Sequence, residues 1–591
     1  MKLLKNNFLH QYLFILKGHY GRLAILVAGF MALSVMELLG LGLIGPFVGA
    51  VINPEILEKS TYMMIFFNKL KAESGADRIL LLGCSVVFIF SIKNYFAYKV
   101  QSKVYGFSFK YRTSLVEKLM GVYMAMPFSF YLERNSSSII NTVIGHTKAI
   151  TDDMLLPSLK LISDAIVLFA LSVFLFVVSP VAMMFLLTIL LITMFLYISI
   201  VKPKIRNYGA SVSSHSEDLI RGVNQSIGAL KEIRVLGVEN TFFKFVSLAS
   251  KNTSDSQTGF YSLMLIPRYL IEIVFVVFLV LYSFYIYHYS VGQDSLISSL
   301  AVMAIAGMRM LPSITGISGS LATINYSKHA LMELYEDVRA IDGKVSLYAN
   351  NESLFISTPE KFQSLSVRSV DYAYPKSEKL AINKLSIELN EGESIGLVGK
   401  SGSGKTTLVD LLLGLYEISN GSIIFNNKAL DSSNLKNWLN QVAYIPQSPF
   451  LIDASLAENV AFGVSPGSID YQKVYKAIEQ AQLSEVLARM SDGIFSRLGE
   501  NGVKLSGGEG QRVAIARAFY HNRNVFIFDE ATSALDTETE KNVVEMIESL
   551  HGEKTMIVIA HRISTLKHCD MIYKLEGGSI VQSGKFSDMF K

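Results

Sequence analysis

The stretch IGLVGKSGSGKTTLVDLLLGL at residues 395–415 decides how the second half of the chain folds. Within it, Gly399, Gly404, Lys405 and Thr406 fit the pattern G-x-x-x-x-G-K-S/T. A strand-like run precedes this pattern and a helix-like run follows it, which is the setting that a phosphate-binding loop requires. Glycines let backbone N–H groups close around phosphate oxygens, and the start of the following helix adds its positive dipole end. The sequence therefore predicts a phosphate-binding loop.

The residues in and near this loop have expected roles in binding and hydrolysing ATP. Lys405 is expected to reach the β- and γ-phosphates, and the Thr406 hydroxyl to ligate Mg²⁺. The apolar run NVFIFDEATSALD places Asp529 at a strand end, where it suits a magnesium-bound water, and Glu530 beside it could polarise the attacking water. An acidic pair at a strand end is often only solvated surface, but a neighbouring phosphate loop favours catalysis. The expected nucleotide contacts in the loop are Gly399, Lys400, Ser401, Gly402, Ser403, Gly404, Lys405, Thr406 and Thr407.

The first half of the chain has the composition of a membrane domain. Of the 591 residues 50% are hydrophobic and 18% charged, and the mean hydropathy is +0.36. A membrane span needs about 20 mostly apolar residues. Several separate runs reach this length, which argues against the buried core of a soluble protein. The expected spans are 23–52, 79–100, 155–178, 181–201, 266–288 and 297–320.

Charge placement predicts how the chain is oriented. The connections 101–154 and 202–260 are rich in Lys and Arg, whereas the turns at 179–180 and 288–295 contain neither. By the positive-inside rule, the long connections and the N-terminus are cytoplasmic, in a multi-pass protein of the cell (inner) membrane. A net charge of +4 does not indicate a nucleic-acid partner. Cys84 and Cys569 form neither a disulfide framework nor a metal-binding spacing.

These patterns divide the chain into domains. Residues 1–340 are expected to form a membrane α-helical bundle, with residues 1–20 as an interfacial helix. Residues 341–360 are a linker, and residues 361–591 form a cytoplasmic α/β domain with the phosphate loop. Residues 53–78 either lie flat on the outer leaflet or pack as a connecting helix.

The stretch LSGGEGQRVAIARA at residues 505–518 resembles the signature motif of ATP-binding cassette (ABC) proteins. This resemblance implies that Tyr374 stacks on adenine, that Gln447 touches magnesium and the attacking water, and that His561 contacts the γ-phosphate. SALD at 533–536 matches the loop that crosses to the partner. LGENG at 498–502 is a partial match to an exporter loop, and Gly510 departs from the usual longer side chain.

The signature also implies a partner. In this family Ser506, Gly507 and Gly508 contact the γ-phosphate of an ATP held by the phosphate loop of the opposite subunit. One loop and one signature per chain imply a head-to-tail homodimer with two ATP and Mg²⁺ sites. About six spans ahead of a cassette resemble a half-size, type IV exporter that works by alternating access. Residues 127–134 and 212–220 are the expected contact helices between the two domains.

Charges inside the expected spans predict a substrate site. Arg268 and Glu272 lie one helical turn apart at the start of a span, where they could neutralise each other. Lys93, Arg309 and Glu37 lie in three other spans. Charges at membrane depth usually face a bundle interior or a water-filled cavity. Lys93, Arg268 and Arg309 are therefore candidate contacts for an anionic substrate.

The membrane half also resembles a narrower group. ELLGLGLIGPF at 37–47, IPRYLIE at 266–272 and MRMLPSITGI at 308–317 resemble the PglK-like lipid-linked oligosaccharide flippases. That resemblance implies a polyprenyl-pyrophosphate glycan as substrate, with its tail in the membrane lipids near residues 55–72. Three alternatives stay open: a lipid A or phospholipid flippase, a peptide or drug exporter, and an ATP-gated channel or regulator. Glu530 and His561 argue against the last, because a gate does not need turnover.

Overall fold

The computed structural model describes residues 8–52, 74–178, 202–289, 293–342, 360–529, 537–560 and 563–590, with isolated positions between 180 and 199. Contacts divide the chain into two compact units. The first comprises Met1–Met126 and Arg134–Glu352, and the second comprises Pro127–Glu133 and Ser353–Lys591.

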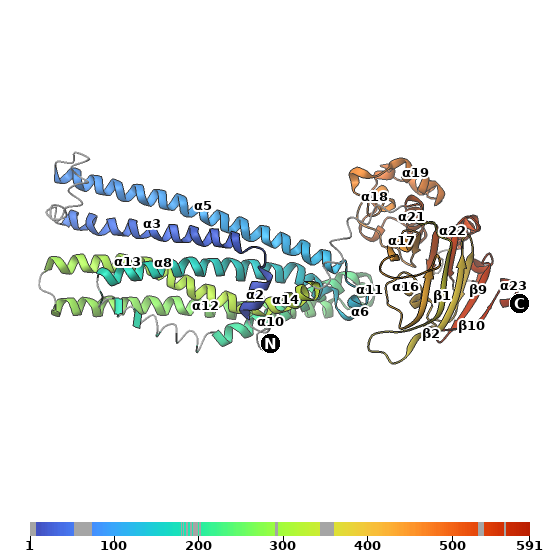
Figure 1. The fold of residues 1–591 in the computed structure, drawn as a ribbon, viewed down its shortest axis with the longest axis horizontal. Coiled ribbons are helices and arrows are strands. Elements are labelled where there is room, and N and C mark those ends of the chain that lie inside the picture. Colours follow the sequence, from blue (N-terminus) through green and yellow to red (C-terminus); the bar gives the residue numbers. More distant parts are fainter. Residues whose placement is uncertain are drawn as a thin grey trace. The chain divides into compact units, whose positions relative to one another are not determined.

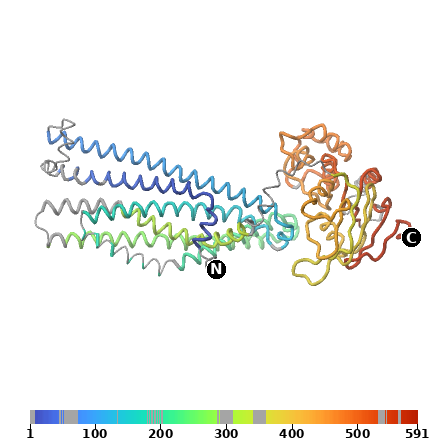
Figure 2. Tube along the Cα trace, in the orientation of Figure 1, coloured from blue at the N-terminus to red at the C-terminus, as the bar shows by residue number. Residues whose placement is uncertain are grey.

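The first unit consists of long helices (Figure 1). Figure 2 follows its backbone, in which α3 lies beside α5, and α12 beside α13. The helices are α2 (Phe8–Ile15), α3 (Tyr20–Ile52), α5 (Gly75–Tyr123), α7 (Ser136–Ile140), π-helical turns at Asn141–His146 and Ala149–Leu155, α8 (Leu156–Val178), α10 (Lys202–Gly228), α11 (Leu230–Leu236), α12 (Glu239–Tyr289), α13 (Gln293–Tyr326) and α14 (Lys328–Asp342).

Small residues bring α3 and α5 close together. A Cβ on Gly40 would lie 2.9 Å from the ring of Phe90, and one on Gly29 would lie 3.4 Å from Val100. Helices inside a membrane associate through close van der Waals packing rather than through the hydrophobic effect, so glycine at the contact is favourable. These pairs set the antiparallel register of α3 on α5.

Four stretches of the described chain are long and apolar enough to cross a membrane: Tyr20–Ile44, Gly75–Tyr123, Ser136–Val177 and Glu239–Phe284. They correspond to the spans expected at 23–52, 79–100, 155–178 and 266–288. The span expected at 181–201 lies mostly outside the described residues. The one expected at 297–320 lies within α13, which is not among the four.

The polar connections are largely helical continuations of the spans. α5 runs to Tyr123, and the helix cannot readily continue past Met126, because a proline disfavours helical geometry at the residue before it. Residues 212–220, expected as a separate contact helix, lie in the middle of α10. The chain instead reverses after α10 through the short helix α11, which ends at Gly237 with a φ of 67°. A left-handed glycine is a common way to end a helix.

The second unit contains two sheets and the helices that cover them. Its strands are β1 (Ser364–Ala373), β2 (Leu380–Asn390), β3 (Ser394–Val398), β4 (Asn420–Phe425), β5 (Lys428–Ala429), β6 (Val442–Ile445), β7 (Val525–Asp529), β8 (Thr555–Ile559), β9 (Met571–Glu576) and β10 (Ser579–Gly584). Its helices are α6 (Ser129–Glu133), α16 (Lys405–Leu412), α17 (Leu435–Leu439), α18 (Leu456–Val460), α19 (Tyr471–Gln480), α20 (Ser484–Ala488), α21 (Gly507–Tyr520), α22 (Thr537–Leu550) and α23 (Phe586–Met589), with short 3-10 turns at Pro466–Ser468, Gly493–Phe495, Glu500–Gly502 and Ile563–Leu566.

The larger sheet has the strand order β10-β9-β3-β8-β7-β6, and all its pairs are parallel except β10 with β9. All five residues of β7 and all five of β8 are buried. Continuous burial is expected for strands of a parallel sheet that is covered on both faces. A smaller antiparallel sheet has the order β2-β1-β4-β5.

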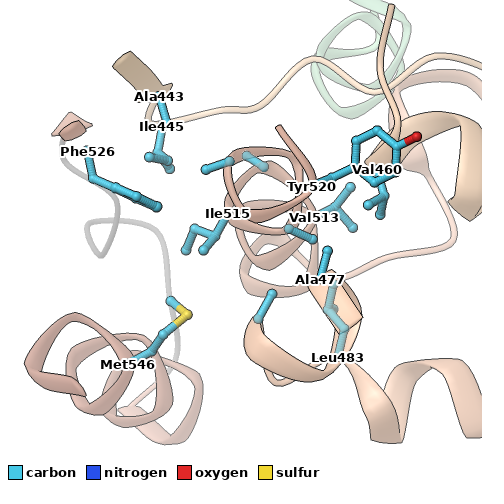
Figure 3. Packing of buried hydrophobic residues seen from close by; sticks show 14 of the residues in the cluster. Ala443, Ile445, Val460, Ala477, Leu483, Val513, Ile515, Tyr520, Phe526 and Met546 are labelled. Atoms are coloured by element: carbon cyan, nitrogen blue, oxygen red, sulfur yellow. The ribbon is translucent and has the colours of Figure 1, made fainter. Parts of the chain in front are cut away.

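One core of this unit surrounds α21, as Figure 3 shows. Val513 and Ile515 of α21 lie among residues of the sheet, including Phe526, and of the helical part, including Val460 and Leu483. Helix α21 is thus packed from both sides. This packing fixes the position of its first turn, which carries the predicted signature.

The central strand β8 offers a test of this fold. Ile557 is 1% exposed, so Ile557→Ala should remove buried contacts and lower the free energy of unfolding of the cassette by about 3 kcal/mol. The single tryptophan, Trp438, is buried in the same unit, and its fluorescence reports unfolding of the full chain in detergent. Val581→Ala, at a side chain 53% exposed on β10, is the matched control. Equal unfolding midpoints for both variants would contradict the assigned core.

Candidate nucleotide site

The phosphate loop lies between β3 and α16, and its glycines are required by space. Gly404 has a φ of 105°, and a Cβ there would lie 2.9 Å from the carbonyl oxygen of Ala381. A Cβ on Gly399 would meet the carbonyl oxygen of Leu575 and the side chain of Ser403. Any larger residue would therefore push the loop away from its neighbouring strands, and the close turn would open.

Lys405, at the first position of α16, is held inside the loop. Its side chain is buried, and Nζ donates hydrogen bonds to the carbonyl oxygens of Gly399 at 2.8 Å and Lys400 at 3.2 Å. The Oγ of Ser403 is also buried and has no hydrogen-bond partner among the described residues. A cation and an unpaired hydroxyl in a glycine cradle at a helix N-terminus fit a phosphate group.

A pocket of about 430 Å³ opens over this loop. It is lined by residues 401–407, by Gly577 and Gly578, and by Tyr374 and Lys379. The Tyr374 hydroxyl lies 2.8 Å from Thr407 Oγ1, which fixes the ring at the pocket wall. The pocket thus combines an aromatic ring with a phosphate loop, as a nucleotide requires. This places Tyr374 and the seven loop residues 401–407 together.

Asp529 lies at the end of β7, where the sequence predicted it, and two unpredicted residues face it. Asp529 is 7% exposed and accepts a hydrogen bond from Tyr444 Oη at 3.0 Å. Burial and the charge of Asp529 raise the pKa of Asp410 to about 6, and the same two causes raise the pKa of Tyr444. Tyr444 lies on β6, next to β7, and Asp410 is five residues after Lys405 on α16. The sequence could have indicated Asp410 only through this position, five residues after Lys405 on the same helix.

The predicted signature begins α21. Ser506 is its N-cap: Ser506 Oγ accepts from Glu509 N at 3.4 Å, and Ser506 N donates to Glu509 Oε2 at 2.8 Å. Arg489 forms an ion pair with Glu509. Partial burial raises the pKa of Glu509, but the bonds from Ser506 and Arg489 outweigh it, so the pKa lies below its ordinary value. Gly507 and Gly508 follow at the start of the helix, and space is open beside Gly507.

Other predicted residues are only partly placed. Gln447 is exposed after β6, and its carbonyl oxygen accepts a bond from Gln511 Nε2 of α21 at 3.2 Å. This bond connects the segment after β6 to the signature helix. Glu530, His561 and the 533–536 loop lie outside the described residues, so their expected roles remain predictions.

In the membrane unit, the three basic candidates have different surroundings. Lys93 of α5 forms an ion pair with Glu37 of α3, and both side chains are nearly buried. Arg268 and Glu272 are both exposed, and no ion pair joins them in the described structure. The interpretation that these two neutralise each other is therefore not realised. The side chain of Arg309 lies outside the described residues.

The carboxylates at the nucleotide site predict a pH-dependent stability. The raised pKa of Asp410, about 6 against an ordinary 3.8, means that the fold favours its protonated form. Its stabilising contribution is therefore present below pH 3.8 and is lost as the pH rises through 6. At pH 7.5, Asp410→Asn should raise stability by about 1 kcal/mol after allowing for solvent screening, or roughly 2–4 °C in melting temperature.

This gain should shrink steadily as the pH falls below 6, because the wild-type carboxyl then takes up its proton. Trp438 fluorescence during heating of the nucleotide-free protein is the measurement. Asp588→Asn, at an exposed position on α23, is the control and should show no such trend. A gain for Asp410→Asn that is the same below pH 6 as at pH 7.5 would refute the assigned effect of burial and of the Asp529 charge on Asp410.

Comparisons with known proteins match both the cassette and the whole chain. The family model described as "ABC transporter" matches residues 382–533. An ATP-dependent lipid A-core flippase of Francisella tularensis is 28% identical over 88% of this chain and 84% of its own length. That of Pseudoalteromonas translucida is 27% identical over 96% of this chain and 93% of its own. That of Ralstonia nicotianae is 41% identical over 37% of each.

A solved structure shares the fold over nearly the full length. A bacterial Atm1-family ABC exporter with ATP bound aligns with a TM-score of 0.76 at 19% identity, covering 97% of both chains. The helical unit and the cassette of this chain thus both have counterparts in that fold. Residues 382–533 match the ABC transporter domain, the whole chain has the fold of an ABC exporter, and four stretches of the described residues are long and apolar enough to cross a membrane.

Proposed function

We propose that this protein uses ATP to flip an anionic lipid-anchored glycan across the inner membrane, most simply a polyprenyl-pyrophosphate oligosaccharide. The observation that carries the proposal is the combination of a built nucleotide pocket with a helix bundle that holds charged residues within apolar spans. Charges within spans usually face a bundle interior or a water-filled cavity, where they are candidates for contacting a substrate. The flippase names of relatives that align over most of the chain support a lipid as cargo.

The working unit is a head-to-tail homodimer, with the cassette and the N-terminus in the cytoplasm. The open space at Gly507 and the capped start of α21 leave backbone N–H groups available to a γ-phosphate from a second copy. ATP then connects Ser506–Gly508 of one copy with the phosphate loop of the other. Closing and reopening this pair would alternate access to the two sides of the membrane.

The residues around the phosphate loop and at the ends of β6 and β7 fit Mg²⁺. The hydroxyl of Thr406, the buried carboxylate of Asp529 and the side chain of Gln447 offer the oxygen donors that this ion prefers. Bound there, Mg²⁺ would neutralise phosphate charge. Glu530, directly after Asp529, would accept the proton of the attacking water, and His561 would contact the γ-phosphate.

For the substrate, Arg268 is the candidate contact that the structure leaves accessible. It is exposed on α12, whereas Lys93 is already paired with Glu37. Lys93 can bind a head group only if its ion pair with Glu37 breaks. We therefore expect the two side chains to separate when an anionic head group binds. Arg309 of α13 remains the third proposed contact.

A second candidate cargo is a lipid A-core glycolipid, favoured by the names of the relatives that align over most of the chain. Both cargoes carry phosphate groups next to a glycan, so both suit basic residues. Reconstituted vesicles with labelled lipid-linked oligosaccharide in one set and labelled lipid A-core in another would separate them. ATP-dependent movement of neither lipid would overturn the proposal and favour a peptide or drug exporter.

The catalytic assignment predicts a specific defect. Glu530→Gln should still bind ATP but hydrolyse it at least about 100-fold more slowly, because the water loses its general base. ATP binding by a fluorescent analogue and phosphate release are measured on the same preparation. Glu545→Gln, the same substitution at an exposed position of α22, should hydrolyse ATP normally. Normal turnover in Glu530→Gln would remove Glu530 from the mechanism.

The substrate assignment predicts a loss of coupling. Arg268→Ala, and separately Arg309→Ala, should lower the amount of anionic lipid moved per ATP hydrolysed, since each removes a positive charge from the path. The measurement is lipid flipping and ATP consumption in the same vesicles. Arg206→Ala, at an exposed arginine of α10 outside the spans, is the control. If this control lowers the ratio as much as Arg268→Ala does, the substrate site has been misplaced.

A further inference from the structure

A second pocket, of about 330 Å³, lies in the membrane unit and far along the chain from the cassette. It is formed where the end of α2 and the turn into α3 meet α5 and α14. Tyr111 of α5 is buried here and donates a hydrogen bond to the carbonyl oxygen of Ile15 at 2.8 Å. The ring of His19 packs edge-on against Tyr111 at 5.2 Å. These contacts fix α2 on α5 and make the pocket a built feature.

The pocket has an apolar floor and a cationic rim. Ile15, Tyr111, Leu115 and Val338 are all less than 9% exposed and form the floor. Lys17 and Lys118 line the rim with His19 and Ser114, and both lysine side chains are exposed. Among the described residues, neither lysine forms an ion pair, and no Asp or Glu lines the pocket. Two cations without a carboxylate therefore flank an apolar surface.

The position along the chain places this pocket at the membrane boundary. The candidate span Tyr20–Ile44 begins directly after the pocket residues 14–19. Helix α2, just before them, exposes Leu9 by 58% and Leu13 by 42%. Exposed leucines on a short helix next to basic residues are typical of a segment that lies at the head-group level. The side of the pocket formed by α2 and the turn into α3 is therefore expected at the level of the lipid head groups.

We propose that this pocket binds the head group of an anionic phospholipid, with the phosphate between Lys17 and Lys118 and the upper acyl chain against the apolar floor. Lysine acts as a point-charge phosphate binder, and basic residues at a membrane surface attract anionic lipids. The apolar floor favours a lipid over a soluble phosphate, because only a lipid buries hydrocarbon there. Such a lipid would connect α2, α5 and α14 as a resident ligand separate from the transported cargo.

The test uses the purified full-length protein and native mass spectrometry of bound lipid. The probes are dioctanoyl phosphatidylglycerol, dioctanoyl phosphatidylcholine and inorganic phosphate. Wild type should bind phosphatidylglycerol more tightly than phosphatidylcholine. Lys17→Ala combined with Lys118→Ala should weaken phosphatidylglycerol binding by about 10- to 30-fold, since each lysine near an anionic surface contributes to affinity. Lys17→Arg with Lys118→Arg should restore it.

The matched control removes the same amount of charge, two lysines, from positions of α5 outside the pocket. Lys103→Ala with Lys110→Ala, both at exposed positions of α5, should leave phosphatidylglycerol binding nearly unchanged. Undiminished binding in the Lys17 and Lys118 double variant, or an equal loss in the control, would overturn the site. Displacement of the lipid by inorganic phosphate at equal concentration would overturn the lipid assignment and identify a soluble anion site. None of these outcomes depends on transport activity.

Discussion

The nucleotide site of this protein depends on one steric constraint, the absence of space for a side chain at Gly404 and Gly399. Strand β3 must turn into α16 directly against the backbone of neighbouring strands, and a Cβ at Gly404 would lie 2.9 Å from a carbonyl oxygen. Because the turn is this tight, the ammonium group of Lys405 lies within hydrogen-bond distance of two loop carbonyl oxygens. The positive charge is therefore positioned by the backbone before any phosphate arrives.

The rest of the cassette holds the elements around that loop in place. The parallel sheet brings Tyr444 of β6 beside Asp529 of β7, and α16 brings Asp410 close enough to raise its pKa. Helix α21 is packed between the sheet and the helical part, while its side chain Gln511 bonds to the segment that carries Gln447. Residues from four separate parts of the sequence are thus held in place by two hydrophobic cores. A shift of one of these elements displaces its neighbours, because they are closely packed against each other.

The same reasoning applies to charge in the membrane unit. An unpaired cation inside a span is costly, and the structure places Lys93 against Glu37 rather than leaving it free. Arg268, at the edge of its span, is exposed and needs no such partner.

Aromatic contacts connect residues of the second unit to its nucleotide pocket. The ring centroids of Phe128 and Tyr416 lie 5.9 Å apart, and those of Tyr416 and Tyr374, at the pocket, lie 5.7 Å apart. Residues 127–133 are thereby connected to the nucleotide pocket through two rings.

The sequence by itself determined the phosphate loop, the signature and four of the membrane helices, because each depends on local pattern: glycine spacing, a capping serine, or about 20 apolar residues in a row. Only the tertiary structure decided which side chains meet. The pairing of Lys93 with Glu37, the approach of Asp410 to Asp529 and the lysine-rimmed pocket at α2 each join residues from different elements. No local pattern encodes such contacts, since they are set by how helices and strands pack, and packing depends on the whole chain.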